Sequence, residues 1–184
     1  MKGFNSGRYP TKINAKRVKA YEVWRHLMLR CGYLNKPPLK RYTQENVSVH
    51  SAWLDYSNFY EDITKIQGYD VDSFVLDKDI LSGKNKIYSP STCCFVPYEI
   101  NVIFTKSDST RGEHLIGVDF HKKTGKFRAR CRKHLGLFDS EYEAFLAYKF
   151  EKERLIKELA CKWKKDIDSR VYEALMTYQV EITD

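Results

Sequence analysis

A row of cations at every second residue stands between residues 126 and 132. The cations are Lys126, Arg128, Arg130 and Arg132. The residues between them are Phe127, Ala129 and Cys131. A period of two predicts a β-strand with one buried face and one face in solvent. An exposed row of arginines can donate paired hydrogen bonds to the O6 and N7 atoms of guanine, and a sheet face fits the major groove of DNA.

The cations of the chain gather in two blocks that contain no acidic residue. The chain has 184 residues, with 32 Lys and Arg against 24 Asp and Glu, so its formal net charge is +8. Residues 1–20 form the first block, for which a disordered basic tail is the alternative reading. Residues 121–134 form the second block, which adds Lys122, Lys123 and Lys133 to the row. Such blocks predict contacts with phosphates, so the expected partner is double-stranded DNA.

The composition excludes several classes of protein. Hydrophobic residues make up 42% of the chain, which is too many for a disordered chain, and no apolar run approaches the roughly 18 residues of a membrane span. No apolar core follows the basic start, so we expect a cytoplasmic protein without a membrane partner. The five cysteines form no CxxC pair, and the adjacent Cys93 and Cys94 would chelate one tetrahedral ion poorly. A structural zinc site with Cys31 and His50 is therefore not expected.

Hydrophobic periodicity and turn residues predict an α+β fold. Helices are expected over 20–32, over 51–67 (one helix or a broken pair, capped by Ser57), over 98–104 and from Ser140 to about residue 160. Short strands are expected near residues 47–49 and 74–76, with a turn at 83–85, a second strand after it, and three strands within 115–138. The expected segments are a basic arm (1–19), a first module (20–104), a linker (105–113), a second module (114–162) and a C-terminal helix (163–184). The apolar stripe of that last helix is expected to pack on the second module, or alternatively to form a dimer contact. The stripe comprises Ile167, Val171, Leu175 and Tyr178.

Residues 115–160 resemble the AP2-type DNA-binding domain. The resemblance is carried by Gly117-Val118, by the run from Thr124 to Arg130, by Leu135-Gly136-Leu137-Phe138-Asp139, and by Glu143-Ala144 and Ala147-Tyr148. It implies a three-stranded antiparallel sheet packed on one helix, with the outer face of the sheet in the major groove. In phages, a domain of this type commonly follows an HNH nuclease module.

Residues 18–104 resemble the ββα-metal module of phage HNH homing endonucleases in a divergent form. The motifs are Leu76-Asp77-Lys78-Asp79-Ile80, Tyr88-Ser89-Pro90, Cys93, Val96-Pro97 and Ile100-Asn101. The resemblance implies that Asp77 and Asn101 bind Mg²⁺ or Mn²⁺, and that Asp79 is a further ligand or orients one.

Lys78 stands where that family has its general-base histidine. A lysine at its ordinary pKa of about 10.4 is protonated at neutral pH and cannot accept a proton. Lys78 could instead hold a phosphate or stabilise the transition state, and it could act as the base only if burial or a nearby metal lowered its pKa by several units. The alternative for this segment is structural: Asp77 and Asp79 cap a turn and pair with Lys78 and Lys84.

The two resemblances together imply a site-specific, metal-dependent DNA endonuclease of the phage homing type. The loss of the histidine favours the alternative, a catalytically inactive derivative that acts as a transcriptional regulator or an anti-defence factor. A protein that packages nucleic acid is a third class, and the modest net charge argues against it. A monomer and a homodimer both remain open.

Overall fold

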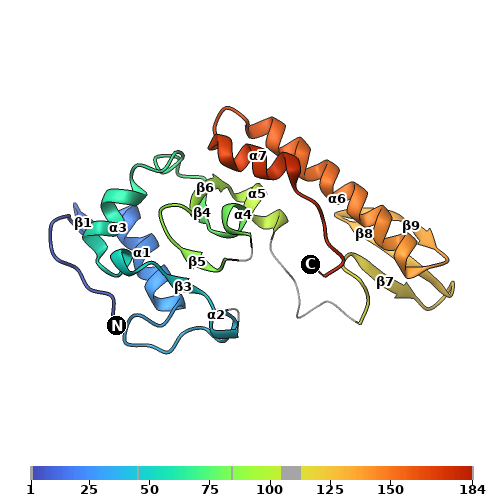
Figure 1. The fold of residues 1–184 in the computed structure, drawn as a ribbon, viewed down its shortest axis with the longest axis horizontal. Coiled ribbons are helices and arrows are strands. Elements are labelled where there is room, and N and C mark those ends of the chain that lie inside the picture. The colour runs from blue at the N-terminus through green and yellow to red at the C-terminus, as the bar shows by residue number, and fades with distance from the viewer. Residues whose placement is uncertain (1, 45, 84, 105–112, 184) are drawn as a thin grey trace. The chain divides into compact units, whose positions relative to one another are not determined.

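The computed structural model describes residues 2–44, 46–83, 85–104 and 113–183 (Figure 1). Its helices and small sheets confirm the predicted α+β class. The chain divides into two compact units, which are described separately. Unit 1 comprises Met1–Tyr98 with Lys165–Val171, and unit 2 comprises Glu99–Lys164 with Tyr172–Asp184. Apart from residue 113, the predicted linker lies outside the described residues.

The core of unit 1 is built from aromatic residues of two helices and a short 3-10 turn. Helix α1 is Lys19–Arg30, the turn η1 is Ser51–Leu54, and helix α3 is Tyr56–Ile63. Trp24, Trp53 and Phe59 are buried, and the Trp24 indole donates a hydrogen bond of 2.8 Å to the Trp53 carbonyl. Helix α1 ends before Gly32, whose φ of +77° suits the residue after a helix C-terminus. Helix α2 (Lys40–Gln44) is a single short segment.

The predicted N-cap of the helix at residues 51–67 was wrong. The segment is the broken pair of η1 and α3, and Asp55 between them is the cap, because its carboxylate accepts the Ser57 N–H at 3.0 Å. Ser57 lies in the first turn of α3, where its hydroxyl bonds Ser6 at 2.8 Å. An Asp two residues earlier competes for the same role, and the sequence pattern alone does not rank the two.

In the described part of unit 1, the strands form three pairs. β1 (Lys12–Ile13) and β2 (Lys16–Arg17) form a hairpin, and β3 (Ser48–Val49) pairs in parallel with β5 (Ile87–Tyr88). β4 (Phe74–Asp77) pairs antiparallel with β6 (Cys94–Pro97). Helix α4 (Asp79–Ser82) follows β4, and helix α5 (Tyr98–Ile103) follows β6 directly.

The strand that follows the predicted turn at 83–85 does not pair with the strand that precedes the turn. That strand is β5, and it joins β3 rather than β4. The partner of β4 is β6, whose four residues are all buried. Lys84 of the turn lies outside the described residues. Pairing between segments this far apart is decided by packing, which no local pattern specifies.

Unit 2 contains a three-stranded antiparallel sheet covered by a long helix (Figure 1). The strands are β7 (Val118–His121), β8 (Lys126–Cys131) and β9 (Lys133–Phe138), with β8 in the centre. Helix α6 (Glu141–Trp163) packs against all three strands. Ser140 caps it as predicted, in a capping box with Glu143. This sheet-on-helix arrangement is the one that the sequence predicted for the second module.

The C-terminal segment contributes to the core of unit 2. Helix α7 is Ser169–Thr177, and beyond it Tyr178 and Val180 pack with Phe145, Tyr148 and Cys131. The expected packing on the second module is therefore confirmed for Tyr178. Ile167 and Val171 are also buried, but they belong to unit 1. Within the described part of the chain, no helix has the length and apolar character that crossing a bilayer requires.

Candidate functional site

The outer face of the β7–β9 sheet carries the predicted basic row. Ala129 and Cys131 of β8 are buried, whereas the Arg130 side chain is 58% exposed. Lys126 and Arg128 have the same parity along β8 as Arg130, so all three lie on the face away from α6. The alternation predicted from the sequence is therefore present from Lys126 to Cys131.

An acidic residue from the neighbouring strand lies within this basic row. Asp119 of β7 is directly opposite Arg128 in the register. Arg128 donates to Asp119 from Nε at 3.1 Å and from Nη2 at 2.7 Å, and Nη2 of Arg130 lies 3.1 Å from the other carboxylate oxygen. The hydrogen bonds from Arg128, helped by the charge of Arg130, lower the pKa of Asp119 despite its partial burial.

The sequence analysis did not identify the role of Asp119. Residues 121–134 contain no acid, but Asp119 precedes them in the sequence and reaches the basic row from the neighbouring strand. A local signal exists: Val118, Asp119 and Phe120 alternate, so Asp119 belongs on the outer face of any strand they form. Its pairing with Arg128, however, depends on the register between two strands.

Arg132 is not part of the strand row, contrary to the prediction. It is the single residue between β8 and β9, with a φ of +57°, while Cys131 pairs directly with Lys133. A one-residue turn reverses the chain at once, so the strict alternation ends at Cys131. Arg132 is exposed in that turn.

Lys133 is directed to the helix side of the sheet rather than to the outer face. Its register partner Cys131 is buried, and cross-strand partners share a face. Its Nζ lies 2.9 Å from Oε1 of Glu151 in α6, which also accepts a hydrogen bond from Arg154 at 2.9 Å. Hydrogen bonds from Arg154 and Lys133 lower the pKa of Glu151 to about 2.

The remaining predicted contacts lie at one end of the sheet. Lys122 and Lys123 are exposed in the turn between β7 and β8, where His121 and Thr124 bond through their side chains at 2.8 Å. Lys126 lies 2.9 Å from Asp139, but that carboxylate is 84% exposed, so the pair contributes little stability. Across the face and its turn, five cations therefore accompany Asp119: Lys122, Lys123, Lys126, Arg128 and Arg130.

Asp77, the first predicted metal ligand, is buried at the end of β4. Its Oδ1 accepts the backbone N–H groups of Asp79 at 2.8 Å and of Ile80 at 2.9 Å. The carboxylate thus caps the first turn of α4. Burial raises the pKa of Asp77, although these two hydrogen bonds oppose the shift.

Lys78 and Asp79 form a charged cluster with a second lysine. The Lys78 side chain is only 5% exposed. Its Nζ lies 2.6 Å from Oδ1 of Asp79 and 5.4 Å from the centre of the Tyr88 ring. Lys86 approaches the same oxygen at 3.0 Å. Burial by itself raises the pKa of Asp79, but the bonds and charges of the two lysines outweigh it and the net pKa is lowered.

This geometry matches the structural alternative for the segment, in which the aspartates cap a turn and pair with lysines. Asp77 caps a turn, and Asp79 pairs with Lys78, while Lys86 occupies the role that the sequence suggested for Lys84. Lys84 itself lies outside the described residues. Asn101, the other predicted ligand, is in α5 and belongs to unit 2, whereas Asp77 and Asp79 belong to unit 1.

The thiols of Cys31, Cys93 and Cys94 lie in environments that keep them protonated. Cys93 and Cys94 are buried, and burial raises the pKa of Cys93 to about 12 and that of Cys31 to about 11. A zinc ligand must be the thiolate. Among the described residues, no three His, Cys, Asp or Glu side chains come together as a metal site would require.

Comparison of this chain with models of protein families, with curated proteins and with solved structures gave no match. The resemblances to AP2-type domains and to HNH nucleases therefore rest on the sequence motifs alone.

Proposed function

We propose that this protein binds double-stranded DNA in a sequence-specific manner through the outer face of the β7–β9 sheet. One observation carries the proposal: Lys126, Arg128 and Arg130 lie on the solvent face of the central strand, while the residues between them face α6. An antiparallel sheet of this kind can enter the major groove, where each base pair presents a distinct pattern of donors and acceptors.

The side chains of this face divide into two roles. Arg128 and Arg130 project from the middle of β8 and suit guanine edges, which accept two hydrogen bonds from one guanidinium. Leu137 is opposite Arg128 in the register and 38% exposed, so it offers an apolar contact for a thymine methyl group. Lys122 and Lys123 in the turn suit phosphates, which fix position rather than sequence.

The test is a binding selection from random duplexes, followed by titration of variants on the selected site. We expect Arg128→Ala and Arg130→Ala to reduce base discrimination by about 1–3 kcal/mol each. We expect Lys122→Ala to weaken binding to all sequences and to lower the salt slope by about 1. Lys157→Ala on α6 removes an exposed lysine outside the sheet and is the control. Equal affinity of all four variants would exclude the sheet-face interface.

Metal-dependent cleavage of DNA by a homing-type HNH endonuclease is the second candidate. It is favoured by the order of elements, because the antiparallel pair of β4 and β6 is followed directly by α5, the ββα order of that family. The donor set does not fit Mg²⁺ or Mn²⁺ in its present arrangement. Asp77 is engaged by two N–H groups, and Asp79 lies between two ammonium groups that would repel a divalent cation. We therefore favour binding without cleavage, as expected for an inactive derivative with a regulatory or anti-defence role.

A cleavage assay on phage and host DNA distinguishes the two candidates. With Mg²⁺ or Mn²⁺, and with an EDTA control, we expect intact DNA together with a salt-sensitive mobility shift. Metal-dependent nicks or breaks at a discrete site, lost in Asp77→Asn and Asn101→Ala, would instead establish the endonuclease. Asn retains the capping oxygen at residue 77, so this variant removes the charge without removing the cap.

A further inference from the structure

The hairpin of β1 and β2 is an ordered ribbon that stands in solvent. Lys12 pairs with Arg17 and Ile13 pairs with Lys16, and all six residues from 12 to 17 are exposed. A ribbon without a buried face adds nothing to a core, and isolated two-stranded hairpins are marginally stable. Packing of its own side chains therefore does not explain why this hairpin is ordered.

The chain on either side of the hairpin is fixed to the body of unit 1. Phe4 exchanges backbone hydrogen bonds with Leu54 and Tyr56, at 2.9 Å each. The Tyr56 hydroxyl donates to the Pro10 carbonyl at 3.0 Å, and the ring of Tyr9 stacks on that of Tyr60 at 4.2 Å. The basic N-terminal segment is thus ordered rather than the disordered tail that the sequence left open. The body of unit 1 positions the base of the ribbon.

The turn at the tip of the ribbon holds a strained residue. Asn14 and Ala15 connect the strands with φ angles of +48° and +64°, the signs of a type I′ turn. Asn adopts this conformation readily, but a left-handed alanine costs roughly 1–2 kcal/mol. The strained tip directs the chain back at once and places Lys16 beside Ile13.

The charge of the ribbon is uniformly positive. Three of the six residues of the ribbon are cations, Lys12, Lys16 and Arg17, and residues 1–20 contain no acid. Arg17 forms a long ion pair with Glu22, at 3.7 Å, and both side chains are exposed. In the part of the chain that the structure describes, Lys12 and Lys16 have no ion-pair partner, so their charges are available to a ligand.

We propose that the β1–β2 hairpin is a second nucleic-acid contact, which binds the phosphates of a DNA duplex through Lys12, Lys16 and Arg17. This inference rests on the proposed function, since it assumes that DNA is the partner. An ordered cationic ribbon complements the phosphate backbone, and the ordering is completed before binding, so little entropy is lost when DNA arrives. The contact carries no base specificity of its own.

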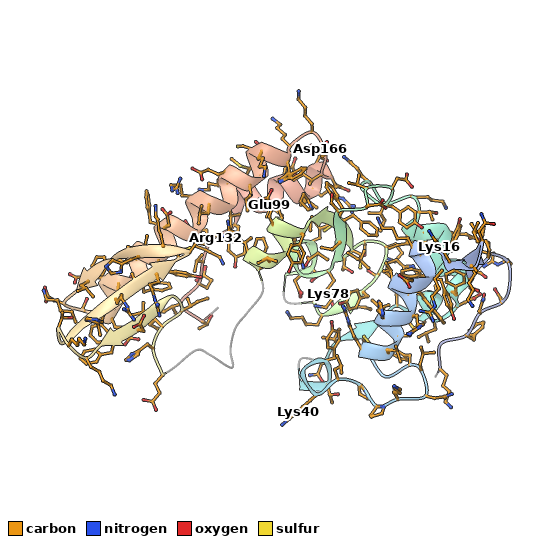
Figure 2. All side chains as sticks on the ribbon, turned by 180° about the vertical axis from the view of Figure 1, so that it is seen from behind. Lys16, Lys40, Lys78, Glu99, Arg132 and Asp166 are labelled. Carbon is orange, nitrogen blue, oxygen red and sulfur yellow. The ribbon has the colours of Figure 1, made fainter. Side chains whose placement is uncertain are left out.

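The first test measures the salt dependence of DNA affinity in the full chain. Each phosphate contact contributes a slope of about 0.9 in log K against log salt. Lys12→Ala with Lys16→Ala should therefore lower the slope by about 1.8. Between 50 and 200 mM salt, the parent should then lose about 12-fold more affinity than the double variant. Lys36→Ala with Lys40→Ala removes the same charge from an exposed segment of unit 1, and Figure 2 shows Lys40 well separated from Lys16. This control should keep the slope of the parent.

The second test locates the ribbon on DNA by photo-crosslinking. A benzophenone amino acid at Ile13, which is 59% exposed, should crosslink to a labelled duplex, whereas the same group at Leu39, 55% exposed, should not. Equal slopes in the two double variants, or equal crosslinking at the two positions, would overturn the hairpin contact alone if the parent binds DNA. A parent chain that binds no DNA would overturn the proposed function and the hairpin contact together.

Discussion

Removal of the Asp119 carboxylate should weaken the sequence preference of this protein while strengthening its general affinity for DNA. Asp119 holds the Nε and Nη2 edge of Arg128 and also contacts Arg130. The guanidinium of Arg128 is therefore kept in one orientation on the sheet face before DNA arrives. A fixed orientation favours a bidentate contact, because less side-chain entropy is lost on binding.

The structure allows the sizes of the two effects to be separated. The side chains of Arg128 and Asp119 are 29% and 34% exposed, so their pair contributes about 0.2–1 kcal/mol to folding, as surface pairs do. A bidentate arginine–guanine contact contributes about 1–3 kcal/mol of discrimination, a factor of about 5 to 150. Asp119→Ala should therefore leave unit 2 folded and still reduce discrimination severalfold. The released arginines should also add about 0.9 to the salt slope on random DNA.

The assay is a titration of the parent, Asp119→Ala and Asp119→Asn against the selected duplex and against scrambled duplexes. Asp139→Ala is the matched control, because it removes one acid beside the same face, where Asp139 is 84% exposed and pairs only with Lys126 among the described residues. The control should strengthen binding to both duplexes alike. If Asp119→Ala keeps the discrimination of the parent, or changes it no more than Asp139→Ala does, Asp119 does not orient the arginines.

Two further substitutions test the packing of unit 2. Gly117→Ala should destabilise the unit by about 2 kcal/mol or more, because the residue has a φ of +76° and the new Cβ would lie 2.0 Å from the Tyr148 ring. Urea unfolding measures this loss, and a midpoint like that of the parent would contradict it. Glu151→Gln should make the stability of the fold depend less on pH in the acid range. The pKa of Glu151 falls from 4.5 to about 2 on folding, so the ionised carboxylate stabilises the fold above pH 4.5, and this stabilisation is lost as the pH falls towards 2. Thermal unfolding between pH 2 and 6 checks this, with Glu173→Gln as an exposed control, and an equal pH dependence in parent and variant would contradict it.

Local patterns in the sequence predicted those features that depend on near neighbours along the chain. The alternation of residues 126–131 specified which side chains of β8 face solvent, since strand side chains alternate in every sheet. Ser140 predicted the start of α6, and the structure adds Glu143 as its partner in a capping box. The α+β class follows from such signals, whereas the sheet-on-helix arrangement of unit 2 was implied by the resemblance to AP2-type domains.

Tertiary structure decided where those side chains find partners. The register between β7 and β8 places Asp119 against Arg128, and the one-residue turn at Arg132 turns Lys133 towards Glu151. In unit 1, the burial of β4 and β6 brings Asp77 to the start of α4 as a cap and leaves Lys78 against Asp79. Sequence alone determined which residue types this protein presents, because propensity and periodicity are local. Only the fold determined which charges are neutralised within the protein and which remain for a ligand, because ion pairs form between segments that strand register and burial bring together.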